Sequence, residues 1–461
     1  MNKKVVIVGA GISGLTTAYL LDKDGYDVTV LEKKDAVGGS IESISEKGYM
    51  FDSGPNSALE TTPLIEQIIN ELNLKDEFVY ANRKGNKRYI LREGVLHPLP
   101  MNPISFFKSK LFSRSGKLRL FAEPLIGRSK DGYYQSIADF VKRRLGKEFL
   151  DYAINPFVAG VYAGNPEDLS VKSAFPKLYD LEEKYGGLIV GTIKSIKERK
   201  NRPEVAKQSA KMFSFVNGMQ VLPLTIAKKL GDKVRLQSEV ISIEKISAGY
   251  KINYTEAGIP LTLTTDYIVS AVPAYIASEI FCKMDNNVTE HLNKVYYPPV
   301  LVIYIAYNIK DIGRPLDGFG FLIPAKEKKS FLGAIWSSVL FPNRAPEDTA
   351  AFTLFVGGAR DPILGSFDKD LLFKMVRNEF ETLMRINAEP VYLSYKFWPK
   401  AIPQYNIGYI EHENSFVRFE KDNLGLILAG NYRDGISVGD CIKSAEKILN
   451  KIKNFSKEVK E

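Results

Sequence analysis

The sequence has little of two residue types that carry much enzyme chemistry. Its 461 residues include only two cysteines, Cys282 and Cys441, and three histidines, His97, His291 and His412. Two cysteines are too few for a disulfide framework, and no Cys/His cluster marks a metal site. The histidines have neither triad-like nor metal-like spacing, so hydrolytic and metal-dependent chemistry lose support. We therefore expect no metal ion and a reducing compartment.

Long apolar runs are also missing. None reaches the length of about 18 residues that a membrane span needs. The first expected strand begins at Lys4, which leaves no room for a signal peptide ahead of it, so we expect a cytoplasmic protein. Acidic residues are outnumbered, with 54 Asp and Glu against 63 Lys and Arg and a net charge of +9. No nucleic-acid-binding module is visible, so we expect no nucleic acid partner.

Apolar residues make up 45% of the chain, which is enough for two or three layered domains. Only the last dozen residues, rich in Lys and Glu, look like a frayed tail. From the periodicity we expect mostly helices over residues 104–199, a linker at 200–208, and strands over 234–252 and 296–398. Strand-turn-helix segments occur at the start, in the middle and at the end, so a nucleotide-binding domain is interrupted by insertions.

The most informative segment is the N-terminus, which reads as strand, glycine-rich turn, helix, strand and acid. An apolar strand over residues 4–8 runs into the turn, and a second strand over residues 27–31 ends at Glu32. This order predicts a dinucleotide cradle: backbone and helix N-terminus face a pyrophosphate, while Glu32 accepts from ribose hydroxyls. The turn consists of Gly9, Ala10, Gly11, Ile12, Ser13 and Gly14.

Two further segments narrow the cofactor. Lys33 follows the acid, and the pair Gly38-Gly39 with Ser40 stands where a loop can lie flat on a second phosphate region, which FAD needs and NAD does not. Near the C-terminus, an apolar strand ends at Gly430 and a helix begins at Val438, so that its N-terminus can face a flavin ring. Together these segments predict an extended FAD site.

A basic, aromatic-rich segment covers residues 104–128. It holds six basic residues and one acid, Glu123, interleaved with large apolar side chains. Such a segment suits an anionic membrane surface. A core-packed helix pair with a solvated basic face is the alternative.

Several motifs resemble one family. The most specific is residues 155–170, Asn-Pro-Phe-Val-Ala-Gly-Val-Tyr-Ala-Gly-Asn-Pro-Glu-Asp-Leu-Ser. Further matches lie at residues 191–194, 355–358, 398–405 and 435–439. Over nearly its whole length the chain resembles the FAD-containing protoporphyrinogen oxidases of the amine-oxidase-like flavoprotein superfamily. Residues 181–199 resemble the plant plastid enzymes more than the Gram-positive ones.

The resemblance implies an α/β fold with α+β inserts and three domains. These are a Rossmann-like FAD-binding domain (residues 1–85, 205–285 and 415–461), a mixed-sheet substrate-binding domain (86–100 and 286–414) and a helical membrane-binding domain (101–204). It also favours monotopic attachment through residues 104–128, peripherally on the inner face of the cell membrane.

The resemblance also implies the reaction. A porphyrinogen loses six electrons to FAD in three two-electron steps, and dioxygen reoxidises the flavin to give hydrogen peroxide. No catalytic side chain beyond the flavin is assigned. Hand-off of the product to ferrochelatase is expected from pathway logic, and a dimer is our guess at the oligomeric state.

Matching positions supply the site residues. Arg88 matches the propionate-binding arginine, Asn56 a position that orients substrate, and Leu322, Ile335 and Phe355 the residues that sandwich the tetrapyrrole. Related oxidases often place Arg where this chain has Ser40. Besides the glycine turn, Glu32 and Lys33, the expected FAD contacts are Gly39, Ser40, Gly54, Pro55, Asn56, Ser57, Val240 (through its backbone), Trp398, Asn431, Ile436, Ser437 and Val438.

Alternatives stay open at this point. Protoporphyrinogen IX, with two propionates, is favoured over coproporphyrinogen III, with four. Another flavin oxidase or desaturase of the superfamily, acting on amines or carotenoids, is a further alternative, and an amine oxidase would show an aromatic cage near the flavin and no propionate arginine. A non-catalytic binder on the same scaffold, such as a prenyl-GTPase chaperone, would have lost tight flavin binding.

Overall fold

Five parallel strands form the sheet that contains the N-terminus. The computed structural model describes residues 3–199, 210–362 and 368–458. The strand order is β10 (Val234–Arg235), β2 (Asp27–Leu31), β1 (Lys4–Val8), β14 (Tyr267–Ser270) and β20 (Leu426–Leu428). Strands that are far apart in sequence therefore become neighbours, because parallel strands must be joined by long crossover connections.

The two faces of this sheet belong to two cores. Val5 and Ile7 of β1 pack into one core, and Val6 and Val8 pack into the other. The first core is built with α1 (Ile12–Lys23), α2 (Pro63–Glu71), α11 (Val221–Leu230) and α17 (Val438–Glu458). The second includes α12 (Ala274–Phe281), α13 (Asn286–Asn293), α16 (Tyr409–Asp422) and the sheet of β11 (Ser238–Ile246), β12 (Gly249–Glu256) and β13 (Ile259–Thr265).

The C-terminal segment is not a frayed tail, and that prediction was wrong as far as Glu458. Helix α17 runs through it, Ile452 is fully buried, and the Phe455 ring stacks against Tyr267 of β14 with centroids 6.3 Å apart. The abundance of Lys and Glu hid an apolar stripe at helical spacing, which includes Ile442, Ile448 and Ile452.

A seven-stranded mixed sheet forms the second unit. Its order is β19 (Tyr392–Trp398), β15 (Val300–Asn308), β18 (Thr349–Gly357), β17 (Gly333–Ile335), β16 (Gly318–Leu322), β7 (Lys87–Arg92) and β8 (Val95–Pro98). Only β16 and β7 pair in parallel. Helix α15 (Lys369–Met384) covers one face, where its Val376 and Phe380 share a core with Phe321 and Leu354.

Smaller elements join the two sheets. They are the hairpin β3 (Ser43–Glu46) and β4 (Tyr49–Asp52), the small sheet β5 (Ala58–Leu59), β9 (Met212–Phe215) and β6 (Phe78–Tyr80), and α14 (Ser337–Leu340).

A helical block follows β8 and extends from Pro103 to Arg199. It comprises α3 (Pro103–Lys108), α4 (Arg114–Phe121), α5 (Ile137–Arg144), α6 (Lys147–Phe149), a π-helical turn (Leu150–Ile154), α7 (Asn155–Tyr162), α8 (Val171–Ala174), α9 (Pro176–Tyr185) and α10 (Leu188–Arg199). Arg144 is fully buried and pairs with Glu123 at 2.9 Å and with Glu182, so that charged side chains inside the block are neutralised. The linker predicted at residues 200–208 lies outside the described residues.

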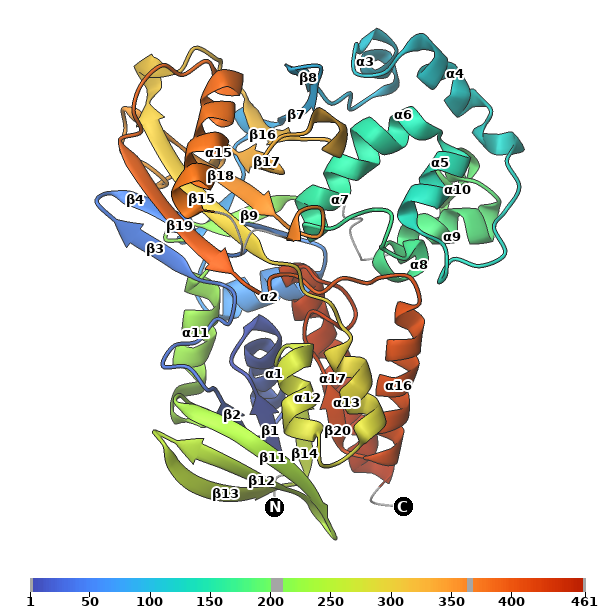
Figure 1. The fold of residues 1–461 in the computed structure, drawn as a ribbon. Coiled ribbons are helices and arrows are strands. Elements are labelled where there is room, and N and C mark those ends of the chain that lie inside the picture. The colour runs from blue at the N-terminus through green and yellow to red at the C-terminus, as the bar shows by residue number, and fades with distance from the viewer. Residues whose placement is uncertain (1–2, 200–209, 363–367, 459–461) are drawn as a thin grey trace.

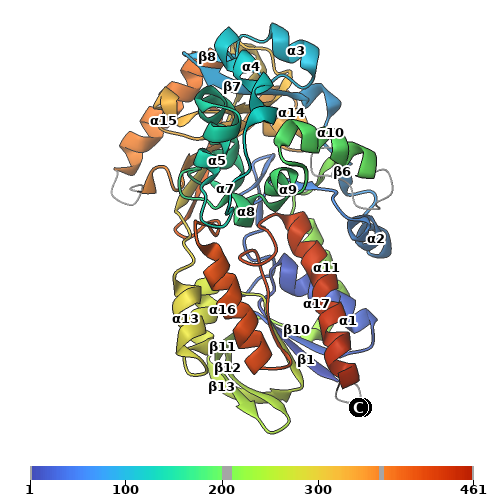
Figure 2. The same cartoon turned by 90° about the vertical axis from the view of Figure 1, so that its right-hand side faces the viewer.

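Figure 1 shows the five-stranded sheet and its helices below, the seven-stranded sheet at the upper left and the helical block at the upper right. Helix α7 lies between the seven-stranded sheet and the rest of the block (Figure 1), and Figure 2 shows the α3–α4 end at the top of the molecule, away from α16 and α17. The predicted α/β class with a Rossmann-like sheet is confirmed. Among the described residues, no helix combines the length and apolarity required to cross a membrane.

Candidate functional site

The glycine turn lies at the carboxyl edge of the five-stranded sheet. Gly9 has a φ of +101°, and its N–H donates to the Leu31 carbonyl at 2.8 Å, which ties the end of β1 to the end of β2. A β-carbon on Gly14 would lie 2.0 Å from the Gly9 carbonyl oxygen, so only glycine lets α1 start this close to β1. A β-carbon on Gly11 would meet nothing within 4 Å, so open space faces this part of the turn.

Glu32 follows β2 and is bound to the turn. Its side chain is 9% exposed, and its carboxylate accepts from the N–H of Ala10 at 2.7 Å and from the N–H of Lys34 at 3.0 Å. Each carboxylate oxygen keeps a further lone pair for a ribose hydroxyl. The Lys33 side chain lies elsewhere, because its ammonium pairs with Glu239 at 2.6 Å on the surface.

The predicted cofactor loops stack on one another through glycines. The Gly38 N–H donates to the Ala10 carbonyl at 2.9 Å, and a β-carbon on Gly39 would lie 3.2 Å from the Gly11 α-carbon. The turn after β4 packs on the Gly39-Ser40 loop in the same way, since a β-carbon on Gly54 would lie 1.9 Å from the Ser40 carbonyl oxygen. Three segments that are separate in sequence therefore meet over one edge of the sheet.

The turn after β4 is held in two ways. The Asn56 amide donates to the Gly54 carbonyl at 3.0 Å, and the Trp398 indole N–H donates to the Ser53 carbonyl at 2.8 Å. Gly54, Pro55, Asn56 and Ser57 stay half-buried. Trp398 ends β19, so this contact joins the predicted cofactor loop to the seven-stranded sheet.

The C-terminal loop between β20 and α17 reaches the same edge. Ser437 and Asp440 cap α17 reciprocally: the Asp440 N–H donates to the Ser437 hydroxyl at 3.2 Å, and that hydroxyl donates to the Asp440 carboxylate at 2.6 Å. Asn431 and Ile436 are half-buried in this loop. The loop thus ends at a capped helix N-terminus with the dipole of a long helix behind it.

Val240 lies in β11, close in the fold to Glu32. The Ser238 N–H donates to the Glu32 carbonyl at 2.7 Å, and a β-bulge follows Val240.

The turns and side chains at this edge of the sheet fit FAD on two observations. Gly11 faces open space, and the buried Glu32 carboxylate is fixed beside the glycine turn by its hydrogen bonds. The residues that would hold FAD therefore lie in the turns after β1, β2 and β4, in β11, at the end of β19 and in the loop before α17.

The predicted substrate residues share one face of the seven-stranded sheet. Phe355 pairs with Gly333, and Gly333 pairs with Leu322, so Phe355 and Leu322 lie on one line across three strands. In a second line across the sheet, Ile335 pairs with Gly320, and Gly320 pairs with Arg88. Because directly opposed residues point to the same face, the four side chains stand opposite the face that α15 covers.

Glycines separate these side chains. Gly333 stands between Phe355 and Leu322, and Gly320 stands between Ile335 and Arg88. A β-carbon on either glycine would lie 2.4 Å or less from a backbone carbonyl oxygen of the neighbouring strand. The sheet face is therefore recessed at these two glycines. Half-buried apolar side chains flank Gly333 on both sides, whereas Gly320 has the half-buried Ile335 on one side and the exposed Arg88 on the other.

Arg88 stands at the edge of this face. Its side chain is exposed, and its guanidinium lies 5.5 Å from the ring centroid of Phe319. None of the ion pairs found within the described residues engages it, so its charge is available to an anion.

Helix α7, in the segment of residues 155–170, packs on this sheet. A β-carbon on Gly160 would lie 2.8 Å from Leu322, and Ala159 and Ala163 share a small cluster with Phe355 and Trp398. Small residues thus let α7 approach the predicted substrate residues closely.

Sequence reasoning missed two arginines that fix these elements. Arg360 donates to the Ile323 carbonyl at 2.9 Å and to the Asn155 side chain at 2.6 Å, and burial lowers its pKa to about 10. Arg344 is 3% exposed and lies 3.7 Å from Asp52, and it donates to the Ser214 hydroxyl at 2.9 Å. Burial is the main reason why the pKa of Asp52 is raised. Nothing local in the sequence signals either arginine's role, because Asn155, Asp52 and Ser214 lie more than 100 residues away from them.

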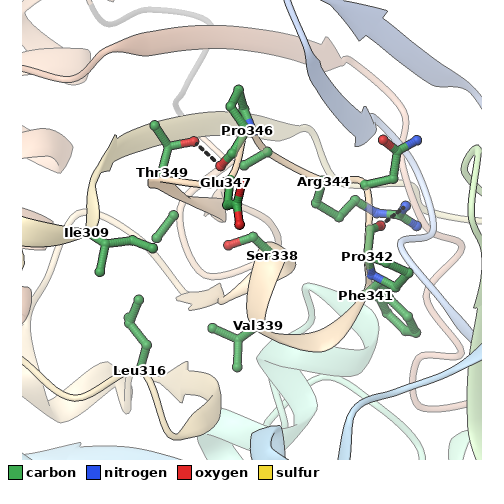
Figure 3. Close-up of a pocket in the computed structure, with 13 residues that line it drawn as sticks. Ile309, Leu316, Ser338, Val339, Phe341, Pro342, Arg344, Pro346, Glu347 and Thr349 are labelled. Atoms are coloured by element: carbon green, nitrogen blue, oxygen red, sulfur yellow. Dashed lines mark hydrogen bonds between the residues drawn. The ribbon is translucent and has the colours of Figure 1, made fainter.

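A cavity of about 310 Å³ lies elsewhere, beside α14 (Figure 3). Its lining includes Leu316, Val339, Phe341 and Glu347, and none of the predicted site residues. Arg344 also lines it, but its guanidinium is engaged with Ser214. The cavity therefore does not belong to the site described above.

Comparisons with known proteins give a consistent result. The family model for flavin-containing amine oxidoreductase matches residues 12–448. Protoporphyrinogen oxidase 2 of Arabidopsis thaliana, described as chloroplastic/mitochondrial, is 33% identical over 100% of this chain and 96% of its own length. Coproporphyrinogen III oxidase of Bacillus subtilis is 26% identical over 97% of each chain. A solved structure from Exiguobacterium sp. 255-15 has a TM-score of 0.79 at 22% identity over 98% of this chain and 99% of its own, which shows the fold.

Proposed function

The chain belongs to the flavin-containing amine oxidoreductases and, among them, to the FAD-dependent protoporphyrinogen oxidase family, and from this premise we propose that it oxidises protoporphyrinogen IX to protoporphyrin IX. It is an FAD-dependent oxidoreductase. The proposed reaction removes six electrons from the porphyrinogen in three two-electron steps. Three molecules of dioxygen take these electrons and leave as hydrogen peroxide.

One observation carries the choice of substrate. Leu322, Ile335 and Phe355 lie on one face of the seven-stranded sheet beside Gly333 and Gly320, and at its edge stands Arg88, a cation without an ion-pair partner in the described part of the chain. An apolar macrocycle that carries propionates fits this combination. The planar guanidinium grips a carboxylate with two parallel hydrogen bonds.

The residues of the chain bind, orient and exclude water. FAD, when bound, supplies the hydride acceptor. The stacked loops at Gly11, Gly39 and Gly54 would hold its phosphates and ring system, and Glu32 would accept from its ribose. Trp398 contacts both the Ser53 carbonyl and the cluster of Phe355, so it sets the cofactor loop beside the sheet face. No side chain is assigned to proton transfer.

Three units divide this work in the proposal. Residues 1–85, 205–285 and 415–461 form the FAD-binding domain, residues 86–100 and 286–414 the substrate-binding domain, and residues 101–204 the membrane-binding domain. All strands of the five-stranded sheet lie in the first and all strands of the seven-stranded sheet lie in the second, which supports the division. Helix α13 and the start of α16 belong to the second by sequence but pack in a core of the five-stranded sheet.

Coproporphyrinogen III is the second candidate substrate, because a Bacillus relative carries that name. The higher identity to the plant enzyme, 33% against 26%, favours protoporphyrinogen. Aerobic turnover of both porphyrinogens, followed by porphyrin fluorescence and peroxide release, tests the proposal. Faster turnover of protoporphyrinogen supports it, while faster turnover of coproporphyrinogen assigns the other substrate. Inactivity on both would refute it.

The proposal includes attachment to an anionic membrane surface through α3, α4 and the turn at residues 123–125. Exposed apolar side chains gather there, with Ile104 70%, Leu118 68% and Leu125 86% exposed. The one acid of this segment, Glu123, is fully buried against Arg144, so it adds no negative charge to the surface. Lys108, Lys110 and Arg114 remain exposed. Apolar side chains with surrounding cations match the headgroup region of anionic lipid.

Attachment of this kind would place the enzyme on the inner face of the cell membrane. Hand-off of the porphyrin to a ferrochelatase and assembly as a dimer complete the proposal. Co-sedimentation with a ferrochelatase and light scattering of the purified protein test these two points separately.

A further inference from the structure

Two stacked tyrosines lie under the loop that precedes α17. The rings of Tyr405 and Tyr409 have centroids 4.5 Å apart and planes inclined by 26°. Tyr405 is 3% exposed and Tyr409 is 2% exposed. Tyr405 belongs to the motif at residues 398–405, and Tyr409 is the first residue of α16. Neither has a part in the function proposed above.

Both hydroxyls bond to the loop of residues 431–435. Tyr405 donates to the Asn431 carbonyl at 2.8 Å and accepts from the Gly435 N–H at 3.1 Å. Tyr409 donates to the Tyr432 carbonyl at 2.6 Å. Three main-chain groups of one short loop are thus satisfied by two buried side chains, which fixes the loop where it passes from β20 to α17.

A tyrosine hydroxyl is protonated at neutral pH, and burial favours that state further. Burial raises the pKa of both Tyr405 and Tyr409 well above the usual value of a tyrosine. The two donors are therefore present throughout the physiological pH range.

The same segment holds the end of the 155–170 motif. The Ser170 N–H donates to the Tyr405 carbonyl at 2.9 Å, and the Gln404 amide donates to the Tyr162 carbonyl at 2.9 Å. Leu169 and Asn406 form an isolated antiparallel bridge. Tyr405 therefore bonds with its backbone to the segment that contains α7 and with its side chain to the loop before α17.

We propose that Tyr405 and Tyr409 are positioning residues that hold the loop of residues 431–435 against FAD and in register with α7. The inference rests on the proposed assignment of Asn431, Ile436, Ser437 and Val438 to the cofactor. Tyr405 acts through the loop: its two hydrogen bonds order Asn431 and Gly435, and this order sets where the capped N-terminus of α17 points. A rigid loop loses less conformational entropy when the cofactor binds.

The test replaces one hydroxyl and leaves the ring. In holoenzyme carrying Tyr405→Phe, we expect the dissociation constant for FAD to rise about tenfold, since two hydrogen bonds that order the loop are lost. Equilibrium dialysis with flavin fluorescence measures it. The visible flavin spectrum should shift, and with porphyrinogen kcat should fall while KM stays the same. Tyr409→Phe should act in the same direction and serves as a second variant should the first fail to fold.

Tyr250→Phe is the matched control. Tyr250 is 1% exposed, and its hydroxyl also donates to a backbone carbonyl, that of Leu424, at 2.9 Å, but it makes no contact with the loop. The inference is overturned if Tyr405→Phe and Tyr409→Phe change FAD dissociation no more than Tyr250→Phe does. The FAD measurement needs no substrate, so its outcome is separate from any failure of the proposed porphyrinogen oxidation.

Discussion

The Gly9 carbonyl oxygen lies 2.0 Å from the point where a β-carbon on Gly14 would stand. This closeness joins the end of β1 to the first turn of α1 and leaves no room for any side chain. Gly11, between the two, has a φ of −72° and open space where its β-carbon would be. The glycines of one turn therefore have different roles, and substitution can separate them.

Gly14→Ala should damage the fold, whereas Gly11→Ala should damage cofactor binding alone. Overpacking at Gly14 should lower the free energy of unfolding by at least about 1–3 kcal/mol. Gly11→Ala should leave the unfolding midpoint of the FAD-free protein unchanged and raise the FAD dissociation constant by roughly tenfold or more, because a methyl group then occupies the phosphate position. Chemical denaturation and FAD titration measure the two effects. Full FAD affinity in Gly11→Ala would remove this residue from the site.

Arg88→Ala should weaken substrate binding without affecting the flavin. Loss of a bidentate carboxylate contact should raise KM about 10- to 100-fold, with the flavin absorption spectrum intact. Lys87→Ala is the control, because Lys87 is the neighbouring residue in β7 and pairs with Asp317 at 2.5 Å. Steady-state kinetics decide: equal KM values in the two variants would contradict the propionate role.

Replacing Ile104, Leu118 and Leu125 together with serine should release the protein from membranes. Each exposed apolar side chain contributes about 1 kcal/mol or more when it enters the interface, so binding should fall roughly 100-fold. Flotation with anionic liposomes at moderate salt measures this. The control carries serine at Ile259 and Leu424, each 64% exposed on the five-stranded-sheet half of the molecule. The membrane proposal fails if the wild-type protein does not float with the liposomes. It also fails if the wild type floats and the triple variant floats to the same extent as the wild type and the control.

Acid should destabilise the fold through His412. Burial first, and then the nearby His291, lower its pKa to about 4, and the Nδ1 atoms of the two rings lie 2.8 Å apart. The unfolded value is about 6.5. As the pH falls through this window, the unfolded chain takes up a proton that the folded protein refuses. The free energy of unfolding therefore contains the full contribution of the neutral His412 ring above about pH 6.5. This contribution, at most about 3 kcal/mol, is lost as the pH falls towards 4.

The check is urea unfolding of the wild type and of His412→Gln at pH 7.5 and pH 4.5. The variant should lose much less stability between the two pH values than the wild type. Equal losses would assign the acid sensitivity to other groups.

The sequence predicts well what local patterns encode. The strand at residues 4–8, the glycine turn and Glu32 are found in the expected order because a continuous apolar run followed by a positive-φ glycine leaves few other structures. Composition misled at the C-terminus, where Lys and Glu outnumber the buried Ile448 and Ile452 that decide the structure.

Long-range partners escaped prediction for a different reason. Arg344 reads as an ordinary surface residue, and only the tertiary structure brings Asp52 and Ser214 to it. Likewise, no pattern tells that Tyr405 reaches the Asn431 carbonyl. The substrate face itself depends on strand register, because Leu322 and Phe355 become neighbours only through Gly333.

The order of strands in the five-stranded sheet has a consequence for biosynthesis. β1 and β2 leave the ribosome first, but β14, which pairs with β1, follows more than 230 residues later, and β20 is among the last segments to emerge. The edge of β1 that pairs with β14 therefore stays without its partner strand for most of translation. Sheets with such non-local strand pairing fold slowly, and their unpaired strand edges are prone to aggregation until the partner strands arrive. Newly made chains should accordingly depend on chaperones until β20 and α17 close the sheet.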